Sequence, residues 1–71
     1  MWPEYCYYAR PEGYNRYYVL CQTREGELFD QSNLTKKEAI TLAKHKREEM
    51  GISVPVSNFD HVTEKFTVHG G

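Results

Sequence analysis

The sequence predicts a small two-layer α+β domain, in which a three- to four-stranded antiparallel sheet packs against one helix in the order β-β-β-α-β. The chain has 71 residues, which is enough for one domain with a thin core. Its first half holds alternating, aromatic-rich segments separated by glycine-bearing turns, and its middle holds one segment with helix-capping signals. We therefore expect a single domain over residues 1–71, ending in a short disordered tail at residues 69–71.

Composition and charge restrict the function classes. The hydrophobic fraction of 39% and the charged fraction of 27% are ordinary for a folded chain. The net charge of −1 lacks the basic excess that is usual in domains that bind nucleic-acid backbones. No apolar run is long enough to span a membrane, and the N-terminus has no basic region followed by a hydrophobic stretch. The sequence therefore predicts a cytoplasmic protein that makes no membrane contact.

Three segments in the first half of the chain have the features of β-strands: Tyr5–Ala9, Arg16–Thr23 and Glu27–Gln31. The second is the clearest, because Tyr17 and Val19 alternate with Tyr18 and Leu20. Both of its faces carry large side chains, so we expect it to be central in the sheet. The pattern alone leaves open which face meets the helix.

Two turns connect these strands, and each contains a glycine that permits positive φ, Gly13 and Gly26. If the first turn is centred between Gly13 and Tyr14, antiparallel pairing places Cys6 opposite Cys21. This register is decisive for the sheet, because a slip of one residue would move every side chain to the other face.

The two cysteines, Cys6 and Cys21, are expected to be reduced thiols in a cytoplasmic chain. A cross-strand disulfide stays open as an alternative, since it requires the register above. Structural zinc sites show paired ligands a few residues apart, such as C-x2-C, and the sequence has no such pair. We therefore predict no metal and no cofactor.

The sequence carries no catalytic constellation. It contains no nucleophile elbow, glycine-rich phosphate loop or H-E-x-x-H motif. Asp60 and His61 are sequence neighbours that we expect to be solvated. Because a two-layer domain of this size has little room for a pocket that excludes water, the chain is predicted not to be an enzyme.

The helix is the clearest element. Thr35 and Glu38 have the spacing of a capping box, in which each side chain accepts from the other residue's backbone N–H. Gly51 occupies the expected left-handed position after the last turn, followed by Ile52. An apolar arc faces the sheet and consists of Ala39, Ile40, Leu42, Ala43 and Met50.

After the helix, residues 53–56 are predicted to be a connector or an edge piece, because Pro55 lacks the N–H that a central strand needs. Asn58–His61 is predicted to be a turn. Thr63–Val68 alternates and is predicted to be the last strand.

The tyrosine-rich segment is the most informative feature for function, since all six tyrosines fall between Tyr5 and Tyr18. One interpretation is structural, with cross-strand aromatic pairs that stabilise the sheet. The other is an aromatic patch that faces solvent away from the helix and binds a partner. The candidate binding residues are Trp2, Tyr5, Tyr7, Tyr14, Tyr18, Arg10 and Arg16.

Small size, near-neutral charge and this aromatic excess favour a stand-alone protein-binding module that acts as an inhibitor or adaptor on a larger protein complex. In size and style, though in no motif, the chain resembles small phage and mobile-element products that disable host machinery. A homo-oligomer that pairs through an edge strand or the tyrosine face is compatible with this function.

A nucleic-acid-binding module is the alternative. Three strands followed by a helix that begins with the segment Asn33–Ala39 resemble the sheet-plus-helix arm-binding domains of some tyrosine recombinases. That resemblance implies a sheet laid in the major groove. The strand expected after Gly51 and the negative net charge depart from the pattern, so no residue role is transferred.

The exposed-patch interpretation predicts the outcome of one substitution pair. Replacing Tyr7 and Tyr18 together with serine should abolish partner binding and leave the melting temperature almost unchanged. A large loss of stability would instead place both residues in the core.

Overall fold

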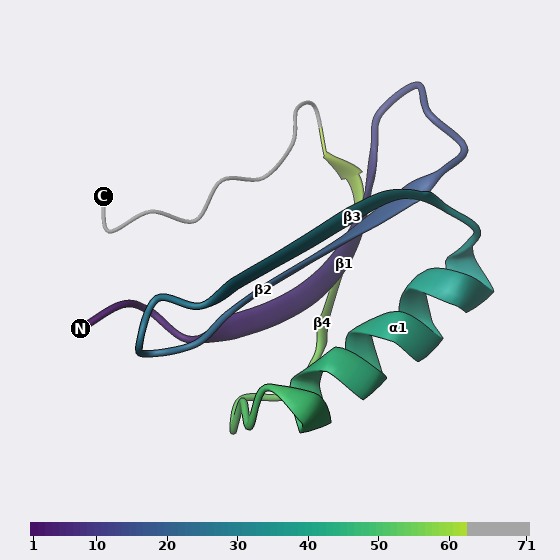
Figure 1. Cartoon of the computed structure of the whole chain (residues 1–71). Helices are drawn as coiled ribbons and strands as arrows, with labels where there is room; N and C mark the ends of the chain where they lie inside the picture. The colour runs from purple at the N-terminus through teal and green to yellow at the C-terminus, as the bar shows by residue number, and fades with distance from the viewer. Residues whose placement is uncertain (63–71) are drawn as a thin grey trace.

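The computed structural model describes the backbone of residues 1–62 and the side chains of residues 1–58. In chain order these residues form β1 (Tyr5–Pro11), β2 (Tyr17–Gln22), β3 (Leu28–Leu34), α1 (Lys36–Glu49) and β4 (Ser57–Val62). The strands make one sheet in the order β3-β2-β1-β4, and α1 lies across one of its faces (Figure 1). The predicted α+β class, the order of the elements and the central place of β2 are confirmed.

The sheet is mixed, whereas the sequence predicted an antiparallel one. β1 pairs with β2 and β2 with β3 in antiparallel fashion, but β4 runs parallel to β1. The reason is the helical connection: α1 carries the chain from the edge strand β3 back across the sheet to the far side of β1. A crossover of this kind makes β4 run in the same direction as β3. Because β3 and β1 are both antiparallel to β2, β4 is also parallel to β1.

The position of the last strand was predicted wrongly in part. Asn58–His61, predicted to be a turn, lies within β4. Its Asn and Asp residues favour turns in isolation, and the pairing with β1 overrides that local preference. Pro55 lies in the connector before β4, as expected. The strand predicted at Thr63–Val68 and the tail at residues 69–71 lie outside the described residues.

The predicted register between β1 and β2 is confirmed. Cys6 pairs with Cys21 and Tyr8 with Val19. At the turn between the strands, the Tyr14 N–H donates to the Pro11 carbonyl oxygen over 3.1 Å, and Gly13 has a φ of 85°. A residue with a Cβ would be strained in that conformation, so glycine is needed there.

The hydrogen-bond pattern of β2 brings the two cysteines close together. The Thr23 N–H donates to the Glu27 carbonyl oxygen of the neighbouring chain segment over 2.9 Å. Backbone groups of every second residue point to the same side, so those of Cys21, two positions before Thr23, point toward β3. Cys6 and Cys21 are therefore a non-hydrogen-bonded pair of β1 and β2, the type with the shorter Cα separation. Their Cα atoms are 4.0 Å apart.

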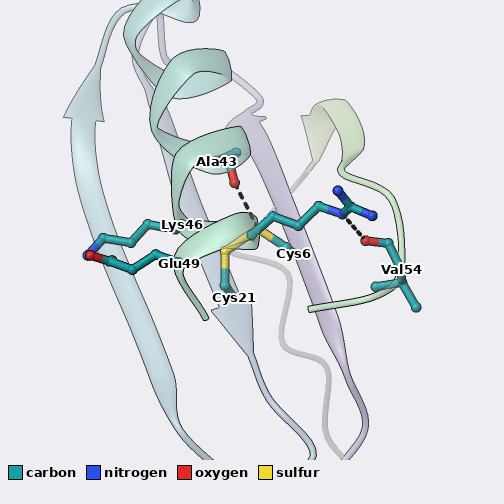
Figure 2. Close-up of a disulfide and its surroundings, with 7 residues drawn as sticks. Cys6, Cys21, Ala43, Lys46, Glu49 and Val54 are labelled. Atoms are coloured by element: carbon teal, nitrogen blue, oxygen red, sulfur yellow. Dashed lines mark hydrogen bonds and ion pairs between the residues drawn. A yellow bond between two sulfur atoms is a disulfide. The ribbon is translucent and has the colours of Figure 1, made fainter. Parts of the chain in front are cut away.

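Cys6 and Cys21 form a disulfide beneath α1, close to Ala43 (Figure 2). The expectation of reduced thiols is thus corrected, and the alternative, a cross-strand disulfide, is the one found. Both cysteines are buried between the sheet and the helix. The physical reason is the register, which aligns two side chains on the same face at a close pair.

Each sheet face has its own apolar cluster, and the alternation of β2 decides the division. Tyr17, Val19 and Cys21 face the helix and pack with Ala39 and Ala43 of α1. The opposite face carries a second cluster of Tyr7, Ala9, Tyr18 and Leu20. The side of β2 that meets the helix, which the sequence left open, is therefore the side of Tyr17.

The ends of α1 follow the predicted capping signals. The Thr35 hydroxyl accepts from the Glu38 N–H over 3.2 Å, and the Glu38 carboxylate accepts from the Thr35 N–H over 2.9 Å. After the last turn, Gly51 has a φ of 70°, and the Ile52 N–H donates to the Arg47 carbonyl oxygen over 2.9 Å. The predicted start and end of the helix are confirmed.

Two basic side chains of α1 attach the helix to its surroundings. The Lys46 ammonium lies 4.6 Å from the centre of the Phe29 ring. It also forms an ion pair with Glu49 (Figure 2). The Arg47 guanidinium donates to the carbonyl oxygens of Ser53 over 3.1 Å and of Val54 over 2.5 Å. These bonds fix the connector that leads into β4.

Reduction of the disulfide should lower stability. The bond joins residues separated by 15 positions, and closing a loop of that length stabilises a fold by about 3 kcal/mol through the entropy of the unfolded chain. We expect a clear fall in the melting temperature, measured by circular dichroism, on addition of a reductant. A variant with both Cys6→Ala and Cys21→Ala is the control and should not respond to reductant. In protein purified under oxidising conditions, two free thiols titrated in denaturant would contradict the bond.

Candidate functional site

The structure has an open pocket at the end of the sheet that carries the β1–β2 turn. Its volume is about 320 Å³. The turn side is formed by Pro11, Tyr14 and Arg16, and the other lining residues are Tyr17 and Tyr18 of β2 with Ser32 and Asn33 of β3. Most of this lining is apolar surface. The pocket therefore suits a large apolar or aromatic group with a polar or charged group at its rim.

A β-bulge in β3 shapes the pocket. Tyr17 pairs with Leu34 and Val19 with Gln31, so two β3 residues, Ser32 and Asn33, oppose Tyr18 alone. Asn33 has a φ of 64°, a left-handed conformation that asparagine adopts more readily than most residues. Bulges redirect side chains and often lie next to binding or active sites. Here both bulge residues line the pocket.

The turn that forms one wall is held by an arginine. An Arg10 guanidinium nitrogen donates to the Tyr14 carbonyl oxygen over 2.7 Å. This bond closes the turn from the β1 side and leaves the Tyr14 ring at the surface, with 65% of the residue exposed. Tyr14 is thus an aromatic group held out to solvent on a fixed backbone.

Arg16 contributes positive charge at the rim. Its side chain is exposed, and its charge reaches the first turn of α1. The pKa of Glu38 is held below its usual value, mainly by the hydrogen bonds with Thr35 and to a smaller extent by Arg16. The end of the sheet that carries the pocket and the β1–β2 turn, which we call the pocket end, therefore combines an exposed tyrosine, an exposed guanidinium and an apolar pocket lining.

The predicted binding residues do not form one patch. Four of them, Arg10, Tyr14, Arg16 and Tyr18, gather at the pocket end. Trp2 lies at the β2–β3 turn, where its backbone N–H donates to the Arg24 carbonyl oxygen over 3.0 Å. The N-terminus is at this end of the sheet, away from the β1–β2 turn (Figure 1).

Trp2 packs against a glycine of the β2–β3 turn. A Cβ at Gly26 would come within 2.7 Å of the indole nitrogen, so only glycine fits beneath the ring. Tyr5 lies at the same end of the sheet and donates from its hydroxyl to the Gln22 side chain over 3.3 Å. These two aromatic residues therefore serve to attach the N-terminal segment and β1 to their neighbours.

Tyr7 and Tyr18 lie on the sheet face away from the helix, as the interpretation of an aromatic patch required, but they are buried rather than exposed. Their exposed fractions are 2% and 3%, and their rings meet edge to face at 6.1 Å between centres. Burial raises the pKa of the Tyr7 hydroxyl far above its usual value, with a further contribution from Tyr18. The expectation of a solvent-facing patch at these positions is thus corrected. Both rings pack with Ala9 and Leu20 in the apolar cluster on this face, and Tyr5 packs against that cluster.

Sequence reasoning missed part of the pocket. Tyr17 was assigned only to a strand face, and Ser32 and Asn33 were not singled out. Glu27–Gln31 was predicted as the third strand, whereas β3 runs from Leu28 to Leu34 and includes the bulge. The available signal was an asparagine between a strand and a helix cap, since asparagine is enriched at positive φ.

The described residues show neither a metal site nor a membrane span. Among them, no three His, Cys, Asp or Glu side chains gather closely enough to hold a metal ion. The helix in this part of the chain, α1, is neither long nor apolar enough to cross a membrane. Comparisons with protein-family models, curated proteins and solved structures found no significant match. The functional argument therefore depends on the pocket itself.

Tyr7 should behave as a core residue. Tyr7→Ala removes a buried ring, and we expect a loss of about 3 kcal/mol in the free energy of unfolding, as for other buried aromatic residues. Tyr14→Ala at the exposed turn should change it by less than about 0.5 kcal/mol. Urea unfolding followed by circular dichroism compares the two variants directly. Equal effects of the two substitutions would contradict the burial of Tyr7.

Proposed function

We propose that this chain is a small protein-binding module, an inhibitor or adaptor that docks on a larger protein complex through its pocket end. The observation that carries the proposal is the pocket itself, which has a volume of about 320 Å³, a largely apolar lining, and exposed Tyr14 and Arg16 at its rim. Tyrosine and arginine are enriched at protein interfaces and among the residues that dominate binding energy. An apolar pocket with aromatic and charged groups at its rim is an arrangement into which a partner side chain fits.

The size and openness of the pocket favour a protein side chain over a metabolite. Small-molecule sites usually span about 300–1,000 Å³ and enclose most of the ligand. This pocket has a volume at the lower limit of that range, and it is open along the sheet end. One large side chain of a docked partner can fill it while the surrounding surface makes the remaining contacts.

Charge supports the same choice over nucleic acid. The net charge is −1, and Arg10 already donates to the Tyr14 carbonyl oxygen at the pocket end. Nucleic-acid binding relies on many phosphate contacts, and its affinity falls steeply as salt rises. A protein interface built around one apolar pocket should depend much less on salt.

A pair of double variants tests the proposal. Tyr14→Ala with Arg16→Ala alters the pocket rim, whereas Trp2→Ala with Arg24→Ala removes an exposed aromatic residue and an arginine from the opposite end. We expect the pocket variant to lose at least about tenfold in affinity for the captured partner, equivalent to 1.4 kcal/mol, and the control to retain it. Capture from nuclease-treated host lysate, followed by titration with the purified partner, measures this.

Other outcomes of this experiment would overturn the proposal. If nuclease treatment of the lysate abolishes capture of the partner, the chain is a nucleic-acid-binding module instead. Equal affinity of the two double variants would remove the pocket from the interface. Melting curves of both variants show that any loss of binding is not a loss of fold.

The cytoplasm is the compartment in this proposal, and the cysteine pair makes it testable. Disulfides are rare in the cytosol, so a cytoplasmic chain should hold Cys6 and Cys21 as thiols in the cell. The buried site can accommodate that state, because the Cys6 sulfur lies 3.4 Å from the Ala43 carbonyl oxygen, where a thiol can donate weakly. Because both cysteines are buried, the cells are lysed directly into denaturant that contains an alkylating reagent, which should label both cysteines. An unlabelled pair would place the protein in an oxidising compartment.

A further inference from the structure

The outer side of β3 is an open sheet edge in the described part of the chain, since β3 is the first strand of the order β3-β2-β1-β4. The bond from the Thr23 N–H to the Glu27 carbonyl oxygen sets the alternation along this strand. Phe29 and Gln31 direct their backbone groups toward β2, and Leu28 and Asp30 direct theirs outward. The edge therefore presents a row of backbone donors and acceptors.

This edge has few of the features that prevent strand pairing. Natural edge strands are commonly blocked by proline, by charged side chains and above all lysine, or by a bulge; β3 has one charged residue, Asp30. Leu28–Leu34 contains no proline and no lysine, and its one irregularity is the bulge at Ser32 and Asn33. Leu28 is 58% exposed at the start of the strand. The stretch before the bulge is thus available for a further strand.

The open edge and the pocket are continuous. Ser32 and Asn33, which end the regular part of β3, also line the pocket. Asp30 and Ser32 are two positions apart, so their side chains are directed to the same side of the sheet. A strand laid along β3 would therefore place one side chain near Asp30 and the side chain two positions along at the pocket.

We propose that the partner docks by adding an extended segment to β3 as a fifth strand beside the four described. A large apolar residue of that segment enters the pocket, and a lysine or arginine two positions away lies beside Asp30. Main-chain hydrogen bonds supply affinity in such strand addition, and the pockets for alternate side chains supply specificity. The inference rests on the proposed function and specifies the class of ligand that the pocket end takes.

Charge favours a different protein over a second copy of this chain. Asp30 is exposed, and so are Glu25 and Glu27 at the preceding turn. Two copies of β3 paired antiparallel about Asp30 would place two carboxylates directly opposite each other, an arrangement that destabilises a strand pair. A segment with a basic residue at that position gains the opposite interaction.

Proline substitution tests strand addition without altering the pocket. Asp30→Pro removes an outward N–H and should leave the β2–β3 ladder intact, whereas Gln31→Pro removes an inward N–H and should unfold the edge. Asp30→Asn keeps the N–H and removes the charge. The probe is a displayed library of short random linear peptides, selected on the unaltered tagged chain, and the affinity of one enriched synthetic peptide is measured by fluorescence polarisation.

We expect the enriched peptides to share a basic residue two positions from a large apolar residue. Asp30→Pro should lower the affinity for the chosen peptide by at least about tenfold, with little change in the melting temperature of the chain. Asp30→Asn should lower the affinity only for peptides that carry the basic residue. If Asp30→Pro does not fold, amide hydrogen exchange in the unaltered chain gives the answer. The peptide should then slow exchange at Leu28 and Asp30 more than at Gln31, whose N–H already bonds to β2.

Four results would overturn strand addition. One is an Asp30→Pro chain that binds the peptide as tightly as the unaltered chain, and another is peptide binding without slower exchange at Leu28 and Asp30. The third is a concentration-dependent dimer that Asp30→Pro abolishes, which would make the occupant a second copy. If Asp30→Pro still captures the cellular partner and the Tyr14 and Arg16 double variant does not, strand addition fails while the proposed function stands.

Discussion

The pairing of β1 with β2 in a single register is the constraint on which the rest of the structure depends. It places Cys6 opposite Cys21 at a close pair, where the disulfide forms beneath α1. It also divides the large side chains of β2 between two clusters, one under the helix and one on the opposite face. A shift by one residue would exchange these faces and remove the surface on which α1 packs.

The site arises where that regular pairing stops. β2 and β3 keep register from Gln22 to Val19, and the bulge at Ser32 and Asn33 then interrupts it. The pocket lies at this interruption, lined by Tyr18 and both bulge residues on one side and by the β1–β2 turn on the other. The pocket is therefore a consequence of the strand geometry and needs no separate element to form it.

The sequence was sufficient for the features that local chemistry controls. The capping box at Thr35, the glycine at the helix end and the turn that sets the Cys6–Cys21 register were all predicted and confirmed. What could not be predicted depends on contacts distant in sequence. The direction of β4 follows from the path of α1, and the burial of Tyr7 follows from its packing with Tyr18 and Leu20 of the neighbouring strand β2. Asn33, whose role depends on a bulge, likewise carries little local signal.

The parallel pairing of β4 with β1 has a consequence for how the chain folds. β1 and β2 are joined by a short turn, so their contacts are local, whereas Tyr7 pairs with Ser57 across most of the described chain. Contacts of long sequence separation require the loss of more chain entropy before they form, and they slow folding. We therefore expect the three antiparallel strands and the helix to assemble first and β4 to dock last. During that interval, the outer side of β1 is a transient second edge, a point at which a newly made chain is most exposed to mispairing.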